Sequence, residues 1–207
     1  MSESPRLHWL PPRPEDWRAR LKAVAAGAAD AEAWANLVRL ARHDLDFAAT
    51  NALAGVAGRL FPADGPSFAT TRPERLAVMS SATTTHLLPS LVVGALRRGI
   101  PLVAYENDYG LYRNELIEAE GRLAAFGPTS VLFALDARHL ARGVVECRTA
   151  GEAEAALERT LDDLAGLWRR ARERFGAKVL QQTPVACLPA TARSEEHTSE
   201  LQSLTDI

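Results

Sequence analysis

The chain has 207 residues, of which 47% are hydrophobic and 24% charged, and its formal net charge is −2. This length suits one domain, or one domain with a small appendage, of ordinary soluble composition. The small net charge, with acidic and basic residues interspersed, excludes an electrostatic basis for binding nucleic acid or an anionic membrane. The first residues lack the apolar core of a signal peptide and no apolar stretch reaches membrane-spanning length, so we expect a cytoplasmic protein.

The first part of the chain, residues 1–61, is predicted to be a helical region of three amphipathic segments. The first helix is expected to begin at Pro14, with two acidic residues in its first turn. Asp30 is the expected N-cap of the second helix, and the third follows directly. Pro, Gly and Ser cluster in residues 62–74, which we interpret as a linker.

After the linker, buried strands alternate with helices. The predicted strands are 75–80, 101–106, 129–135 and 177–183, and the predicted helices are 86–99, 111–119 and 149–176. Short joints between strands and helices indicate right-handed crossovers and a parallel sheet. The predicted fold class is therefore α/β: an N-terminal helical cap, then a doubly wound, mostly parallel, three-layer sheet that is truncated after its fourth strand.

The last predicted helix carries the clearest local signals. Thr149 and Glu152 have the spacing of a capping box. Five residues form its expected apolar stripe: Leu157, Leu161, Leu164, Leu167 and Trp168.

Ligands of open parallel sheets lie outside the carboxyl ends of the strands. Six residues after the first three strands are the predicted ligand-binding positions: Ser81, Thr83, Thr84, Asn107, Tyr109 and Asp136. Hydroxyl and backbone N–H groups at the first of these turns could hold a phosphate, a carboxylate or an oxyanion. The plainer alternative, which we favour, is that residues 81–85 cap the following helix.

The weak catalytic candidates are Ser81, Asp136 and His139, because a Ser/His/Asp set requires the imidazole to contact both partners. Asp136 more often caps a helix or pairs with Arg138.

The three tyrosines of residues 105–112 could line a pocket, but packing beneath a loop is the favoured interpretation. The cysteines, Cys147 and Cys187, have no metal or redox spacing and are expected to be free thiols. No grouping of His, Cys, Asp and Glu has metal-ligand spacing, so neither a metal site nor a cofactor is expected in this chain.

Four stretches, taken together and in order, resemble a known family. They are WANLVRLARHDLDFAATNAL, LAVMSSATTTHLLPSLVVGALRRGIPLVAYENDYGLYRNEL, FGPTSVLFALDARHL and KVLQQT. Their order and spacing are similar to those of the FkbH-like proteins, also called the HAD-IIIC family, from Asp16 to Pro184. The resemblance implies that residues 75–192 are an incomplete domain of the SGNH-hydrolase-like, or flavodoxin-like, class. In the family it precedes a HAD phosphatase-type domain with a DxDxT aspartate nucleophile and Mg²⁺.

The resemblance further implies an enzyme of phosphatase or glyceryl-transfer type. Such an enzyme loads an acyl group from a phosphorylated donor onto an acyl carrier protein, in polyketide or related secondary metabolism. The many alanines, and basic residues that are nearly all arginine, indicate a bacterial coding sequence. No DxDxT stretch occurs in the 207 residues, and Ser80 replaces a frequent glycine of the family. We therefore expect a fragment that is inactive by itself and binds a small phosphorylated substrate or the carrier protein, with Mg²⁺ needed only in the absent HAD domain.

Two alternatives remain open. The first is an SGNH-type esterase that uses Ser81, although the sequence lacks GDS, Gly-x-Asn-Asp and Asp-x-x-His motifs at the required places. The second is a non-catalytic interaction module of unrelated role.

The final stretch, RSEEHTSELQS from Arg193, resembles the in-frame translation of a common sequencing adapter. Residues 193–207 are therefore expected to be a non-native tail, with the native sequence stopping near Ala192. Glu195, Glu196 and His197 consequently receive no role as metal ligands. A native polar tail is the alternative.

Overall fold

The computed structural model describes residues 9–62, 66, 69 and 71–184. The predicted tail of residues 193–207, the end of the predicted 75–192 domain and Cys187 lie outside the described residues.

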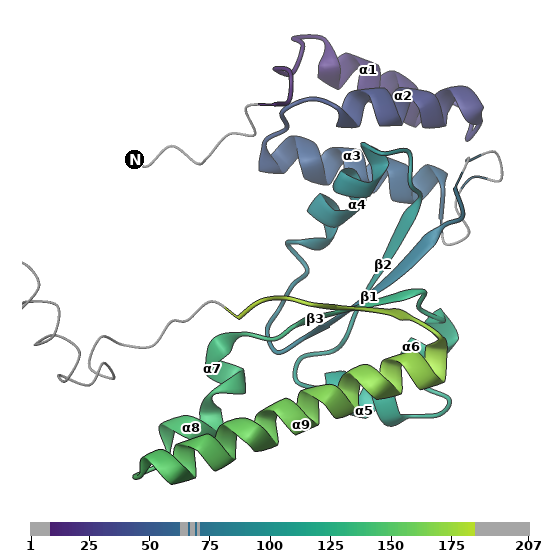
Figure 1. The fold of residues 1–207 in the computed structure, drawn as a ribbon. Helices are drawn as coiled ribbons and strands as arrows, with labels where there is room; N and C mark the ends of the chain where they lie inside the picture. The colour runs from purple at the N-terminus through teal and green to yellow at the C-terminus, as the bar shows by residue number, and fades with distance from the viewer. Residues whose placement is uncertain (1–8, 63–65, 67–68, 70, 185–207) are drawn as a thin grey trace, which may run out of the picture.

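The N-terminal helices are α1 (Trp17–Ala26), α2 (Ala31–Ala41) and α3 (Phe47–Leu60). Together with α4 (Leu88–Leu96) they bury one apolar cluster, in which Leu37 and Leu53 have no exposed surface. Trp17 is also buried there, and its indole N–H donates to the carbonyl oxygen of Leu40 at 3.0 Å. Figure 1 shows these helices stacked against α4, on one side of the sheet.

The predicted start of α2 is confirmed, whereas the predicted start of α1 is wrong. The Asp30 carboxylate accepts from the Ala33 N–H at 2.8 Å, so the predicted N-cap of α2 is confirmed. The predicted start at Pro14 is wrong, because the Pro14 carbonyl closes a turn by accepting from the Trp17 N–H at 3.1 Å. The Asp16 carboxylate lies before the helix and pairs with Arg20 at 2.8 Å.

The sheet contains strands β1 (Glu74–Ser80), β2 (Leu102–Glu106), β3 (Ser130–Ala134) and β4 (Lys178–Gln181). Its described strands are parallel and lie in the order β2-β1-β3-β4. The predicted α/β fold class is confirmed, and each predicted strand is found.

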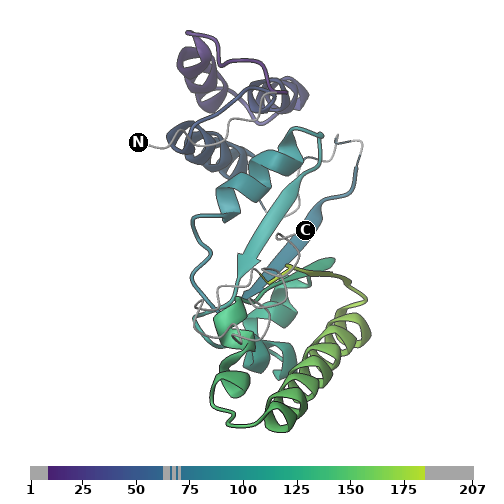
Figure 2. The same cartoon turned by 60° about the vertical axis from the view of Figure 1, so that its left-hand side comes forward.

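Helices cover both faces of this sheet. The chain runs from β1 to β2 in one direction across the sheet and from β2 to β3 in the other. Right-handed crossovers therefore place the helix between β1 and β2 on one face and the helices between β2 and β3 on the opposite face. Leu76 and Val78 of β1 pack toward α4, whereas Ala77 and Met79 pack toward the other layer. That layer consists of α5 (Tyr112–Ile117), α6 (Arg122–Phe126) and α9 (Ala150–Phe175). Figure 2 shows α9 on the side of the sheet away from α1–α4.

Helix α9 confirms the predicted capping box but not the whole predicted stripe. The Thr149 hydroxyl accepts from the Glu152 N–H at 3.2 Å, and the Glu152 carboxylate accepts from the Thr149 N–H at 3.3 Å. Leu157 and Leu161, however, are 52% and 55% exposed. The buried residues of α9 are Ala156, Leu164, Leu167 and Ala171.

Two unpredicted helices, α7 (Ala137–Leu140) and α8 (Arg142–Val145), explain the corrected stripe. They lie along the first half of α9, where the Thr160 hydroxyl donates to the Leu140 carbonyl at 3.4 Å. Ala156, a small residue, is buried where α7 and α8 lie close to α9. The first half of α9 therefore buries a small side chain, and its leucines remain exposed. Of the helices that the structure describes, none has both the length and the hydropathy needed to cross a membrane.

Candidate functional site

The turn after β1 is fixed by buried polar contacts. The Ser80 N–H donates to Asn107 Oδ1 at 2.6 Å, and Asn107 Nδ2 donates to the Ser80 carbonyl at 3.2 Å. The Ser80 hydroxyl donates to the Ala134 carbonyl at 3.1 Å. Asn107, a predicted ligand-binding residue, therefore joins the ends of β1 and β2 and uses its amide for that purpose.

The next residue along the turn, Ser81, contacts Asp136 at the end of β3. Its hydroxyl donates to Asp136 Oδ2 at 2.6 Å and accepts from the Asp136 N–H at 3.1 Å. The other carboxylate oxygen accepts from the His139 N–H at 2.9 Å, so Asp136 is the N-cap of α7. The hydrogen bond from Ser81, together with that cap, lowers the pKa of Asp136 below its ordinary value. Two predicted site residues are thus brought together, and the expected capping role of Asp136 is confirmed.

The third catalytic candidate, His139, faces a different partner. Its Nε2 atom lies 2.8 Å from the hydroxyl of Tyr112. A catalytic set needs the imidazole between the serine and the carboxylate. Here the Ser81 hydroxyl contacts the carboxylate directly, so this arrangement is not a Ser/His/Asp triad.

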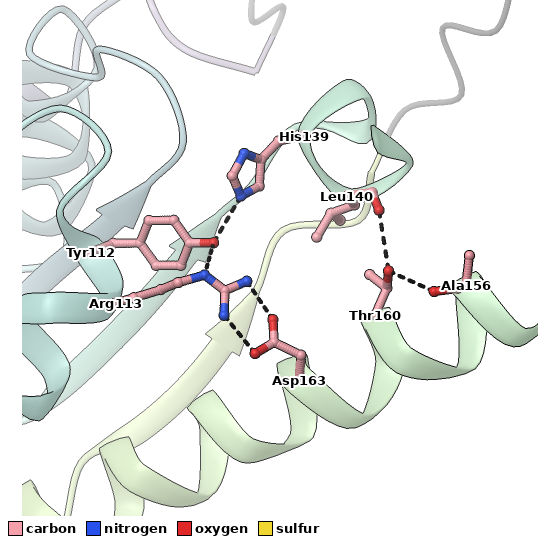
Figure 3. Close-up of polar contacts among 7 residues, drawn as sticks. All are labelled: Tyr112, Arg113, His139, Leu140, Ala156, Thr160 and Asp163. Carbon is pink, nitrogen blue, oxygen red and sulfur yellow. Dashed lines mark hydrogen bonds and ion pairs between the residues drawn. The ribbon is translucent and has the colours of Figure 1, made fainter. Parts of the chain in front are cut away.

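The imidazole belongs to a network that joins three helices, shown in Figure 3. Arg113 Nε donates to the Tyr112 hydroxyl at 3.0 Å, and the guanidinium forms a two-pronged ion pair with Asp163 of α9. This pairing lowers the pKa of Asp163 and raises that of Arg113, while burial raises the pKa of Tyr112.

The network also indicates the state of the imidazole. The Tyr112 hydroxyl oxygen accepts a hydrogen bond from Arg113. The one proton of this hydroxyl is therefore donated to Nε2 of His139, which acts as the acceptor. Burial lowers the pKa of His139 below 6.5, in agreement with a neutral ring that carries its proton on Nδ1.

Glu106, which was not among the predicted site residues, organises the turn before α4. Its Oε1 atom accepts from the N–H and the hydroxyl of Thr84, at 2.6 and 2.8 Å. Its Oε2 atom accepts from the Thr85 hydroxyl at 2.7 Å. Burial raises the pKa of Glu106, but the hydrogen bonds from Thr85 and Thr84 outweigh it, so the net pKa is lowered.

This contact corrects the favoured interpretation of residues 81–85. Helix α4 begins at Leu88 after Leu87, and no side chain caps it, so the hydroxyls do not act as caps. The anion at the backbone N–H of Thr84 is the carboxylate of Glu106, from the same protein. An external phosphate would have to displace that carboxylate.

The three tyrosines differ in exposure: Tyr112 is buried, Tyr105 is partly buried and Tyr109 is exposed. Tyr112 is buried, and the Tyr105 hydroxyl donates to Glu115 Oε2 at 2.6 Å. Burial, with this hydrogen bond, raises the pKa of Tyr105. Tyr109 is 79% exposed, and Thr83 is exposed as well. The packing interpretation is therefore confirmed for two of the three tyrosines, and Tyr109 remains available for contact with a partner.

The carboxylates at this edge do not form a metal site. Glu106 and Asp136 accept hydrogen bonds from hydroxyl groups, and Asp108 pairs with Arg122 at 2.7 Å. Within the described residues no group of three His, Cys, Asp or Glu side chains could hold a metal ion. The family resemblance implies Mg²⁺ only for a HAD-type domain, and not for these residues. The exposed groups of this edge, Thr83, Tyr109 and Asp136, can form hydrogen bonds and ring contacts.

Comparisons with known proteins add a distant likeness. No protein-family model and no curated protein matches the chain. A similar solved structure is the N-terminal part of the protein BF1531 from Bacteroides fragilis, which contains a phosphatase domain complexed with Mg. The TM-score is 0.49 at 14% identity, over 63% of this chain and 33% of that chain, so this chain spans about a third of its length. At such values the likeness assigns no function, and the phosphatase domain and the Mg are properties of the Bacteroides protein.

Proposed function

We propose that this chain acts as the N-terminal region of an FkbH-like enzyme of the HAD-IIIC type, and that it binds a substrate or a partner without chemistry of its own. The parent enzyme would load an acyl group from a phosphorylated donor onto an acyl carrier protein, in polyketide or related secondary metabolism. The order and spacing of the sequence motifs from Asp16 to Pro184 support this proposal.

The contact between Ser81 and Asp136 is the observation that carries the non-catalytic role. A serine becomes a nucleophile when a neighbouring base removes its proton. The partner of Ser81 is a carboxylate of lowered pKa, which is a weak base, and the imidazole of His139 is bonded to Tyr112. Acyl transfer at Ser81 therefore lacks a base, and we assign the chemistry to the aspartate and the Mg²⁺ of the HAD-type domain.

The exposed residues of the same edge support a binding role. Tyr109 extends from the loop after β2, and Thr83 and Asp136 are exposed on the neighbouring loops. Tyrosine is enriched among residues that contribute most to protein interfaces, because it combines a large apolar ring with a polar hydroxyl. This surface is the proposed contact for the carrier protein or the substrate.

A serine-directed fluorophosphonate probe tests the proposal. We expect no labelling of the folded protein at probe concentrations that fully label an authentic serine hydrolase in the same tube. Ser81→Ala and the matched control Thr83→Ala, on the same turn, should give the same blank result. Labelling of the wild type that is lost in Ser81→Ala but kept in Thr83→Ala would overturn the proposal and favour the SGNH-hydrolase alternative.

A further inference from the structure

A cavity of about 580 Å³ lies between α3, α4 and β2, and it meets the polar contacts of the candidate site at Thr85. Its walls are mainly apolar, with Leu88, Val92 and Leu96 along α4 and the aromatic rings of Trp34 and Phe61 on the helical cap. We call it the α3–α4 groove. Its volume falls in the range of about 300–1,000 Å³ that is usual for small-molecule sites, which often lie between structural units.

Two glycines of α3 form part of this groove. Gly55 and Gly58 line it, and a Cβ atom added at either position would meet no atom within 4 Å. Glycine destabilises a helix interior relative to alanine, and the packing around these positions does not require it. Glycine instead allows a bound molecule to approach the α3 backbone closely.

One end of the groove is polar. Thr85 lines the groove and also donates to Glu106 Oε2, so this end opens at the carboxyl edge of the sheet. The lowered pKa of Glu106 keeps its carboxylate charged at neutral pH. A ligand with a negatively charged end would be repelled there, whereas a hydroxyl, an amide or an amine could donate to the carboxylate.

We infer that the α3–α4 groove binds a small molecule with a hydrocarbon part and a neutral or cationic polar end. The hydrocarbon part lies along α4 against Gly55 and Gly58, and the polar end lies at Thr85, next to the carboxylate of Glu106 that Thr85 contacts. The walls come from α2, α3, α4 and β2 and surround the volume of a small molecule. A protein partner would need a surface of about 800 Å² on each side.

The test is a fluorescence titration of the intact chain with the neutral apolar probe N-phenyl-1-naphthylamine. We expect saturable binding at one site. Decanol below its solubility limit, or decylamine below its micellar concentration, should displace the probe, and decanoate should do so at least about ten-fold less effectively. Gly58→Leu should weaken probe binding about ten-fold or more, because its side chain fills the groove. Leucine favours a helix more than glycine does, so this variant should be at least as stable as the wild type.

Gly94→Leu is the matched control, since Gly94 is also helical with open space around a Cβ atom but does not line the groove. It should bind the probe as the wild type does. An absence of saturable binding, or equal losses in both variants, would overturn the proposal. If light scattering shows a dimer of the wild type and Gly58→Leu dissociates it, the groove is an interface between two copies of the chain, and the proposal is overturned. Decanoate that competes as well as decylamine would overturn the assignment of the polar end.

Discussion

Two carboxylates at the carboxyl edge act as internal anions. Glu106 takes three hydrogen bonds from Thr84 and Thr85, and Asp136 takes bonds from Ser81 and from the backbone of α7. In both cases a charged group satisfies donors that would otherwise face a ligand. The loops of this edge are therefore held in place by the protein itself, and what they offer to a partner is the set of exposed side chains around them.

Glu106 gives a prediction for stability against pH. Its pKa is lowered from 4.5 in the folded state, so its contribution is complete above that value and is lost as the pH falls below it. Glu106→Gln should reduce the free energy of unfolding at pH 7 by about 1 kcal/mol, a modest value because the carboxylate is partly exposed. Urea unfolding at pH 7 and pH 3.5 measures both effects, and the difference between wild type and variant should shrink at pH 3.5.

The matched control is Glu158→Gln on the exposed face of α9. It should leave the free energy of unfolding at both pH values within about 0.5 kcal/mol of the wild type. A Glu106→Gln deficit that stays constant down to pH 3.5 would mean that the charge of Glu106 does not stabilise the fold.

The sequence predicted that Ser81 and Asp136 lie within reach of each other, but not their direct hydrogen bond, and it missed the role of Glu106. Ser81 directly follows β1, Asp136 lies two residues after β3, and these strands are neighbours in the sheet, so the topology alone brings the two residues together. Glu106 is the last residue of β2, and whether its side chain turns toward Thr84 depends on the exact register of the strands. Local patterns carry no information on that register.

At the scale of elements, length decides what the sequence predicts. The strands have apolar runs and α9 has a clear helical period, so the sequence predicted all of them. It also predicted the capping box of α9. Helices α6, α7 and α8 have five, four and four residues, too few for an amphipathic period to appear. Because α7 and α8 were missed, the partner of the first half of α9 was missed too, and the leucines there were assigned to the core.

Two leucines of α9 test this correction. Leu167 is 1% exposed and Leu161 is 55% exposed, although both belong to the predicted stripe. Leu167→Ala should lower the free energy of unfolding by about 3 kcal/mol, because it leaves a cavity in the core. Leu161→Ala, the control in the same helix, should change it by less than about 0.5 kcal/mol. Equal losses in urea unfolding would restore the predicted leucine stripe and contradict the packing of α7 and α8 on this helix.

At the scale of the whole molecule, the helices cover the two faces of the sheet unevenly. The face toward α9 packs residues of all four described strands, including Val179 of β4, into one cluster. On the face toward α4, the apolar cluster contains residues of β1, β2 and β3. Leu180 of β4 points to this second face, next to Leu132 in the register, and is 51% exposed. The part of the chain that the structure describes places no helix over that corner of the sheet (Figure 2).

An exposed leucine on an outer strand favours association between chains, because the strand also presents unpaired backbone groups. We expect the wild type to self-associate with rising concentration, and Leu180→Thr to reduce this while keeping a residue that suits a strand. Its free energy of unfolding should stay within about 1 kcal/mol of the wild type, since the side chain is half exposed.

Sedimentation velocity over a concentration series measures the association, with Leu161→Gln as a control that removes an exposed leucine from the opposite side of the sheet. If Leu161→Gln lowers the association as much as Leu180→Thr does, general surface hydrophobicity is responsible. If the wild type stays monomeric with one sharp thermal transition, the four-stranded core is complete without cover at β4, and this corner of the sheet needs no partner.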